Sequence, residues 1–260
     1  MSQGLFETLI KEEQQPFSGW DFSYLEDSGR MVEFPLKWKF SNVLKPYLEN
    51  CHRLLDMGTG GGEYLSSFAP LPAVTFATEG YEPNVTIAAD RLAPLGVTVV
   101  PIESDDHLPF EEDSFDVIMN KHESFNADEV ARLLAEDGYF ITQQVGGLND
   151  CELNIWLNAE PSHFSNWSLR CAVNRLKEAG LTILKATDDV SFTRFYDVGA
   201  IVYYLKAISW QIPDFSVEKY FDRLEAIQAV IDKQEYIDFT RHRFLIVAQK
   251  TKQDELKLQD

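Results

Sequence analysis

The chain has 260 residues, of which 45% are hydrophobic and 25% charged, and its formal net charge is −19 at pH 7. This composition is typical of a globular protein, and no apolar run approaches the roughly 20 residues that a membrane helix needs. The acidic N-terminus lacks the basic and apolar regions of a signal peptide. We therefore expect a cytoplasmic protein without membrane association, and the negative charge opposes binding to nucleic acid.

The three cysteines favour neither a disulfide framework nor a zinc site. Cys51, Cys151 and Cys171 lie far apart, and no C-x-x-C pair occurs. Small buried thiols in a reducing compartment are the simpler interpretation. No other spacing of metal ligands is evident, so we expect no metal.

The chain opens with an aromatic-rich stretch, residues 1–50, which we interpret as an N-terminal helical lid segment. Alternating strands and helices follow over 51–250 and predict a mostly parallel sheet covered on both faces. The predicted strands are 53–57, 73–79, 97–102, 115–120, 139–145, 181–187 and 236–250. The predicted helices are 63–70, 83–96, 126–138, 168–180 and 216–231. Two cap insertions interrupt this rhythm at about 146–167 and 190–235, and a polar tail occupies 251–260.

A glycine-rich loop follows the first predicted strand. The sequence RLLDMGTGGGEYL (53–65) has the spacing Asp56, Gly58, Gly60, Gly62. Such a loop, at the carboxyl end of a parallel strand, is a usual cradle for a cofactor. The dinucleotide fingerprint G-x-G-x-x-G would need glycine at position 63, which is Glu63. This mismatch argues against the alternative that the protein is a nucleotide-binding oxidoreductase.

The acid-x-G-x-G-x-G pattern resembles motif I of the class I S-adenosylmethionine-dependent methyltransferases. The resemblance extends through ATEGYEPN (77–84), ESDDHLPFEEDSFDVIMN (103–120) and EVARLLAEDGYFIT (129–142), and covers residues 52–145. It is closest to the type 11 methyltransferases. More loosely, the chain resembles enzymes of the ubiquinone-biosynthesis type and rRNA guanine methyltransferases, without the zinc module of the latter.

The resemblance implies a Rossmann-like fold and a set of cofactor contacts. The expected sheet has seven strands in the order 3-2-1-4-5-7-6 with the last strand antiparallel, and S-adenosylmethionine is the cofactor. Glu79 is expected to bind the ribose hydroxyls, because a carboxylate accepts hydrogen bonds. Either Ser104 or Asp105 replaces the adenine-binding acid. The full set of expected cofactor residues is Asp56, Gly58, Thr59, Gly60, Gly62, Glu79, Gly80, Tyr81, Ser104, Asp105 and Asn120.

The acceptor is expected to be a small molecule that receives the methyl group under an aromatic lid. His122 is the candidate general base, since imidazole takes a proton near neutral pH; a histidine that caps a loop is the alternative. The candidate substrate residues are Trp20, Tyr24, Glu123, Gln144, Trp156, His163 and Tyr203. An RNA methyltransferase and a noncatalytic module that binds the cofactor remain as alternative functions.

Overall fold

The computed structural model describes residues 2–17 and 20–251, and the chain forms two compact units. The first, here called the helical unit, takes the described residues of 1–37, 146–167 and 189–243. The second, the sheet unit, takes those of 38–145, 168–188 and 244–260. Of the predicted polar tail at 251–260, all but Thr251 lies outside the described residues.

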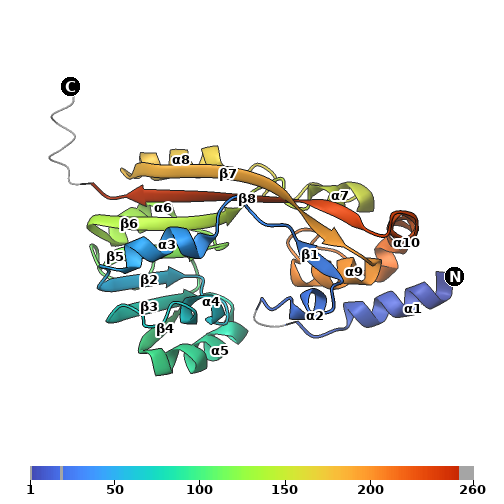
Figure 1. The fold of residues 1–260 in the computed structure, drawn as a ribbon, viewed down its shortest axis with the longest axis horizontal. Coiled ribbons are helices and arrows are strands. Elements are labelled where there is room, and N and C mark those ends of the chain that lie inside the picture. The colour runs from blue at the N-terminus through green and yellow to red at the C-terminus, as the bar shows by residue number, and fades with distance from the viewer. Residues whose placement is uncertain (1, 18–19, 252–260) are drawn as a thin grey trace. The chain divides into compact units, whose positions relative to one another are not determined.

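Parallel strands form the centre of the sheet (Figure 1). The strands are β1 (Met31–Glu33), β2 (Arg53–Met57), β3 (Val74–Glu79), β4 (Val97–Pro101), β5 (Phe115–Lys121), β6 (Leu134–Val145), β7 (Thr182–Phe195) and β8 (Ile237–Gln249). β2 pairs in parallel with β3 and β5, β3 with β4, and β5 with β6. Figure 1 shows β8 running opposite to β6 and β7. The predicted α/β fold with a mostly parallel sheet is confirmed.

The sheet has one strand more than the seven that the sequence predicts. Its order is β1-β7-β8-β6-β5-β2-β3-β4, in which the seven predicted strands keep the predicted order and β1 is added beside β7. β1 pairs antiparallel with β7, with Met31 opposite Phe195 and Glu33 opposite Thr193. A three-residue strand has no periodicity of its own that would mark it in the sequence; it forms because the edge of β7 offers hydrogen-bond partners.

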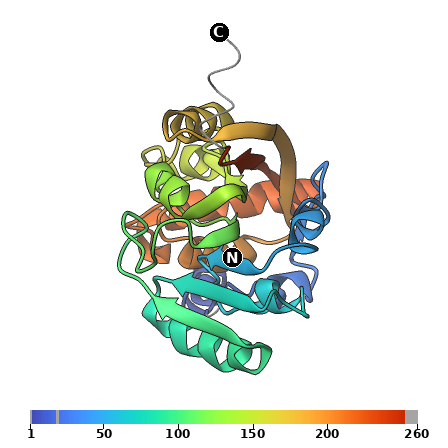
Figure 2. The same ribbon diagram turned by 90° about the vertical axis from the view of Figure 1, so that its left-hand side faces the viewer.

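Helices cover both faces of the sheet unit. They are α3 (Phe40–Leu48), α4 (Glu63–Ser66), α5 (Glu82–Leu92), the 3-10 turn η1 (Ala93–Leu95), α6 (Ala127–Leu133) and α8 (Leu169–Glu178). Phe40 and Leu44 of α3 and Ala88 and Leu92 of α5 pack in one buried cluster with β-strand residues such as Ile141. α6 and α8 contact each other and lie together on one side of the sheet in Figure 2.

Helix α6 begins where the sequence predicts. Asn126, with Glu129 three positions later, has the spacing of a capping box, but the first turn of the helix differs from that pattern. The Asn126 side chain accepts hydrogen bonds from the backbone N–H groups of Asp128 and Glu129, as an N-cap does. Glu129 does not reach back to complete the box. Its buried carboxylate instead accepts from the Leu108 N–H at 2.7 Å and pairs with Arg132 at 2.6 Å. These bonds tie the loop that precedes β5 to α6.

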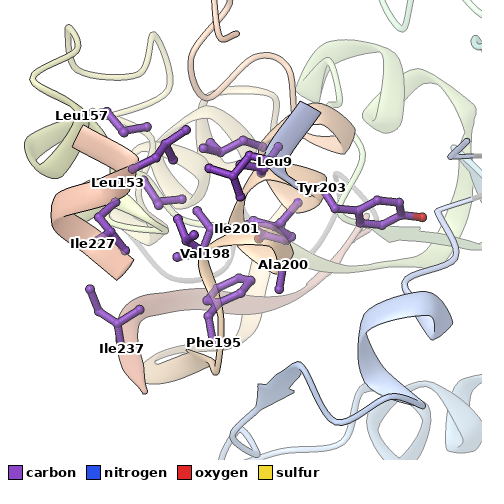
Figure 3. Close-up of a cluster of buried hydrophobic side chains, with 14 of the residues drawn as sticks. Leu9, Leu153, Leu157, Phe195, Val198, Ala200, Ile201, Tyr203, Ile227 and Ile237 are labelled. Carbon is purple, nitrogen blue, oxygen red and sulfur yellow. The ribbon is translucent and has the colours of Figure 1, made fainter. Parts of the chain in front are cut away.

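The helical unit has its own apolar core. Its helices are α1 (Ser2–Glu13), α2 (Ser23–Glu26), α7 (Cys151–Leu157), α9 (Val198–Ala207) and α10 (Val217–Gln234). α9 is buried along almost its whole length, and α1 and α10 both contact it. Leu9, Leu153, Ile201 and Ile227 are among the buried side chains that meet there (Figure 3). Among the described residues, no helix has the length and apolar character needed to cross a membrane.

Candidate functional site

The glycine loop after β2 has a backbone conformation that glycine adopts most readily. Gly58, Gly60 and Gly62 have φ values of +69°, +60° and +81°. Side chains with a Cβ are strained at such angles, whereas glycine is not. The Gly58 N–H donates to Thr78 Oγ1 at 3.3 Å, which attaches the loop to β3. The local sequence thus produces the tight turn that the glycine spacing predicts.

Two carboxylates lie buried beside this loop. Glu79, at the end of β3, is only 5% exposed, and its Oε1 accepts from the Tyr81 N–H at 2.8 Å. Burial raises the pKa of Glu79, and backbone hydrogen bonds from Tyr81, Gly60 and Gly80 oppose that rise. Burial also raises the pKa of Asp56 to about 7. The Glu79 carboxylate therefore joins the loop to β3 through hydrogen bonds with backbone N–H groups.

The two candidates for the adenine-binding residue have different surroundings. Ser104 is exposed, and its Oγ accepts from the Asp106 N–H at 3.1 Å in a local turn. Asp105 is half-buried: its Oδ2 accepts from Ser124 Oγ, whereas its buried Oδ1 has no hydrogen-bond partner. Buried carboxylate oxygens rarely remain without a partner. Asp105, rather than Ser104, therefore offers a ligand a free acceptor.

Asn120 and Gln144 build the loop after β5. Asn120 is fully buried at the end of β5, and its Oδ1 accepts from Thr142 Oγ1 at 2.8 Å and Gln144 Nε2 at 2.6 Å. Its Nδ2 donates to the Ser124 carbonyl at 3.2 Å. Gln144 Nε2 also donates to the Glu123 carbonyl at 2.8 Å. These side chains fix the backbone of residues 123–124, a function that their place at the ends of strands does not reveal in the sequence.

His122 lies at the end of a chain of three side chains. The Trp38 indole N–H donates to Gln143 Oε1 at 2.8 Å, and Gln143 Nε2 lies 2.8 Å from His122 Nε2. Because indole is only a donor, it orients the Gln143 amide so that the NH2 group faces the imidazole. Nε2 then accepts, and a neutral His122 carries its proton on Nδ1. A role as a base at Nε2 requires release from Gln143; that role stays a prediction.

Glu123 lies directly over the start of the glycine loop. A Cβ added to Gly58 would be 2.3 Å from Glu123 Cγ and 2.7 Å from its Oε2. Glu123 Oε1 accepts from the Ser124 N–H at 3.0 Å. Burial raises the pKa of Glu123, and the negative charges of Asp105 and Glu79 raise it further. The sequence analysis places Glu123 among the candidate substrate residues; in the structure its side chain lies against Gly58 of the glycine loop, and its role stays a prediction.

The remaining candidate cofactor residues, Thr59, Gly80 and Tyr81, differ in their burial and contacts. Thr59 is buried, and its side chain hydrogen-bonds to Asp56, which opposes the rise in the pKa of that carboxyl that burial causes. Gly80 has space for a Cβ, whose nearest neighbour would be Ile102 O at 3.6 Å, so close approach does not require glycine there. Tyr81 is 60% exposed, and its backbone N–H serves Glu79. Trp38, Thr78 and Ser124, which complete these networks, carry no motif that singles them out.

The other candidate substrate residues belong to the helical unit. The Tyr203 ring contacts Tyr24 at a centroid distance of 4.8 Å and Phe17 at 6.0 Å, and Phe17 in turn contacts Trp20 at 5.6 Å. Trp156 packs against the apolar core, and His163 is exposed. Trp20, Tyr24 and Tyr203 therefore form one aromatic cluster, which Trp156 and His163 do not join. Their roles toward an acceptor stay predictions.

The sequence is similar to known proteins. Residues 55–142 match a protein family described as "Methyltransferase domain". The chain is 28% identical over 144 residues to the uncharacterized methyltransferase YcgJ of Bacillus subtilis (strain 168), and the match covers 48% of this chain and 57% of that relative. The chain thus spans little more than half the length of this relative.

Solved structures share the fold. The YcgJ crystal structure from Bacillus subtilis has a TM-score of 0.56 at 20% identity, with 82% of this chain and 98% of that chain covered. A protein from Bacillus halodurans C-125 has a TM-score of 0.59 at 17% identity, with 82% and 99% covered. A SAM-dependent methyltransferase from Aquifex aeolicus has a TM-score of 0.51 at 15% identity, with 95% and 98% covered.

The matched domain contains the glycine loop, the buried Glu79 at the end of β3 and the free Asp105 oxygen. They occupy the carboxyl ends of the parallel strands, where ligands of open α/β sheets bind. Residues 55–142 therefore match a methyltransferase domain, and the chain is similar to methyltransferases of known sequence and structure.

Proposed function

We propose that this protein transfers a methyl group from S-adenosylmethionine to a small-molecule acceptor. The observation that carries the proposal is the pairing of a positive-φ glycine loop with the buried carboxylate of Glu79 on the neighbouring strand. A ligand with a ribose fits this pair, because a carboxylate accepts from two adjacent hydroxyls and a glycine backbone permits close approach.

The residues of the sheet unit fit the cofactor part by part. Glu79 would accept from the ribose hydroxyls, and the unpartnered Asp105 Oδ1 would accept from the exocyclic amine of adenine. The glycine backbone from Gly58 to Gly62 would lie against the amino-acid end. The bound cofactor supplies an activated methyl group on a sulfonium, and the protein contributes alignment and exclusion of water.

The charge of the protein supports a small-molecule acceptor over RNA. The chain carries a formal net charge of −19, and three acidic side chains, Glu79, Asp105 and Glu123, lie around the candidate cofactor site. This field repels a phosphate backbone. His122 would accept a proton from the acceptor once Gln143 releases its Nε2.

Isothermal titration calorimetry with S-adenosylmethionine tests the cofactor assignment. Glu79→Ala should weaken binding by at least about tenfold, since a charge-assisted hydrogen bond contributes about 1.5–3 kcal/mol. The matched control is Glu82→Ala, which removes an exposed carboxylate from the first turn of α5 and should bind the cofactor as the wild type does. Unchanged affinity in Glu79→Ala, or micromolar binding of NAD by the wild type, would contradict the proposal.

A further inference from the structure

The acidic side chains of the sheet unit follow the order of its strands. β4, β3, β2 and β5 are successive neighbours in the sheet. Asp105 follows β4, Glu79 ends β3, the glycine loop follows β2, and Glu123 follows β5. If the adenosyl part of the cofactor lies toward Asp105 and Glu79, its other end must extend along the glycine loop toward β5. Glu123 is the carboxylate at that end.

The position of Glu123 is determined by a rigid support. Gln144 Nε2 holds the Glu123 carbonyl at 2.8 Å, and Asn120 Nδ2 holds the Ser124 carbonyl at 3.2 Å. Both supporting side chains are buried and hydrogen-bonded to each other. The side chain then packs on the Cα of Gly58, where a Cβ would come within 2.3 Å of Glu123 Cγ. The carboxylate is therefore held against the loop instead of extending freely into solvent.

The two forms of the cofactor differ in charge at the atom nearest to the reaction. S-adenosylmethionine carries a sulfonium. After transfer, the S–CH3 bond has broken with its electron pair kept by sulfur, the methyl carbon is bonded to the acceptor, and S-adenosylhomocysteine holds a neutral thioether. A half-buried carboxylate attracts a cation more strongly than an exposed one does, because the effective dielectric is lower. A fixed carboxylate at this end would therefore stabilise the substrate form more than the product form.

We infer that Glu123 recognises the positive charge of the cofactor and makes the site bind S-adenosylmethionine in preference to S-adenosylhomocysteine. This inference rests on the proposed function. Glu123 is then a specificity-determining residue that favours release of the spent cofactor. The neighbouring carboxylates Glu79 and Asp105 contribute to the same field, but neither packs on Gly58 in the way that Glu123 does.

The test compares three ligands on three proteins by calorimetry: S-adenosylmethionine, S-adenosylhomocysteine, and sinefungin, in which a protonated amine replaces the sulfonium. Glu123→Gln keeps the size of the side chain and an acceptor for the Ser124 N–H. It should lose about tenfold in affinity for the two cationic ligands, as expected for one charge-assisted contact. Binding of S-adenosylhomocysteine should change less than about twofold by the same conversion. Glu103→Gln removes an exposed carboxylate after β4 and should change none of the three.

The outcomes separate the inference from the proposed function. Equal losses for all three ligands in Glu123→Gln would show a packing role and overturn the inference, while binding by the wild type would leave the proposed function in place. Equal losses for the cationic ligands in Glu103→Gln would attribute the preference to the overall field and also overturn it. If the wild type binds none of the three, the proposed function fails first. Unchanged thermal unfolding of both variants is the check on folding.

Discussion

Replacing Gly58 by alanine should destabilise the protein through two separable effects. The first is the backbone: φ is +69°, and an alanine there costs about 1–2 kcal/mol. The second is overlap, because the new Cβ would lie 2.3–2.7 Å from Cγ, Cβ and Oε2 of Glu123. Overpacking of this kind typically costs about 1–3 kcal/mol. We therefore expect the free energy of unfolding to fall by about 2–5 kcal/mol on adding the two ranges.

Gly96→Ala isolates the first effect. Gly96 has a φ of +79°, and nothing lies within 4 Å of a Cβ added there. Gly96→Ala should therefore lower the free energy of unfolding only through backbone strain. The entropy that alanine removes from the unfolded chain is the same in both variants and cancels. Urea denaturation of Gly58→Ala, Gly96→Ala, Glu123→Ala and the Gly58→Ala/Glu123→Ala double variant completes the measurement. Equal losses for Gly58→Ala and Gly96→Ala, with no coupling between positions 58 and 123, would refute the contact between Glu123 and the loop.

Three further predictions use other parts of the structure. His122→Ala should bind S-adenosylmethionine within about twofold of the wild type but lose turnover if His122 is a base; a lower melting temperature with normal turnover would identify a packing histidine. Burial raises the pKa of Asp150 to about 7 in the folded state, from 3.8. The folded protein therefore retains a proton that the unfolded chain loses, and this contribution to stability falls as pH rises from about 4 to 7. Asp150→Asn cannot ionise, so its unfolding free energy minus that of the wild type should increase over this range; a constant difference in urea titrations would contradict the shift. Finally, micromolar protein should not retard rRNA fragments in a gel at physiological salt, and a salt-sensitive complex with a guanine-containing hairpin would favour an RNA acceptor.

The glycine loop was predictable because the residues that indicate it are close together in the sequence. Asp56, the three spaced glycines and Glu79 all lie within one β-α-β unit, where strand periodicity and turn residues determine the backbone directly. The capping residue Asn126 was predictable for the same reason. The strand β1 was not, because three residues contain no periodic pattern and their partner strand β7 is distant along the chain.

The hydrogen-bond partners of side chains were harder to predict from the sequence than helices and strands were. Asn120 and Gln144 sit at strand ends, a place that suits a ligand contact or a structural hydrogen bond equally well. Their partners come from β5, β6 and the loop at 123–124, whose register a sequence does not specify. Similarly, the choice between Ser104 and Asp105 depends on Ser124, which is 19 positions from Asp105 along the chain.

The chain of hydrogen bonds from Trp38 through Gln143 to His122 connects an imidazole to a fluorophore. Protonation of His122 would turn Nε2 from an acceptor into a donor, and Gln143 would then have to present its oxygen to the imidazolium. That rotation would take Oε1 away from the Trp38 indole N–H, which it now accepts at 2.8 Å. The emission of one tryptophan among five would thereby report the protonation of the imidazole. The difference between the fluorescence emission spectra of the wild type and Trp38→Phe, recorded as a function of pH, would follow the protonation of His122.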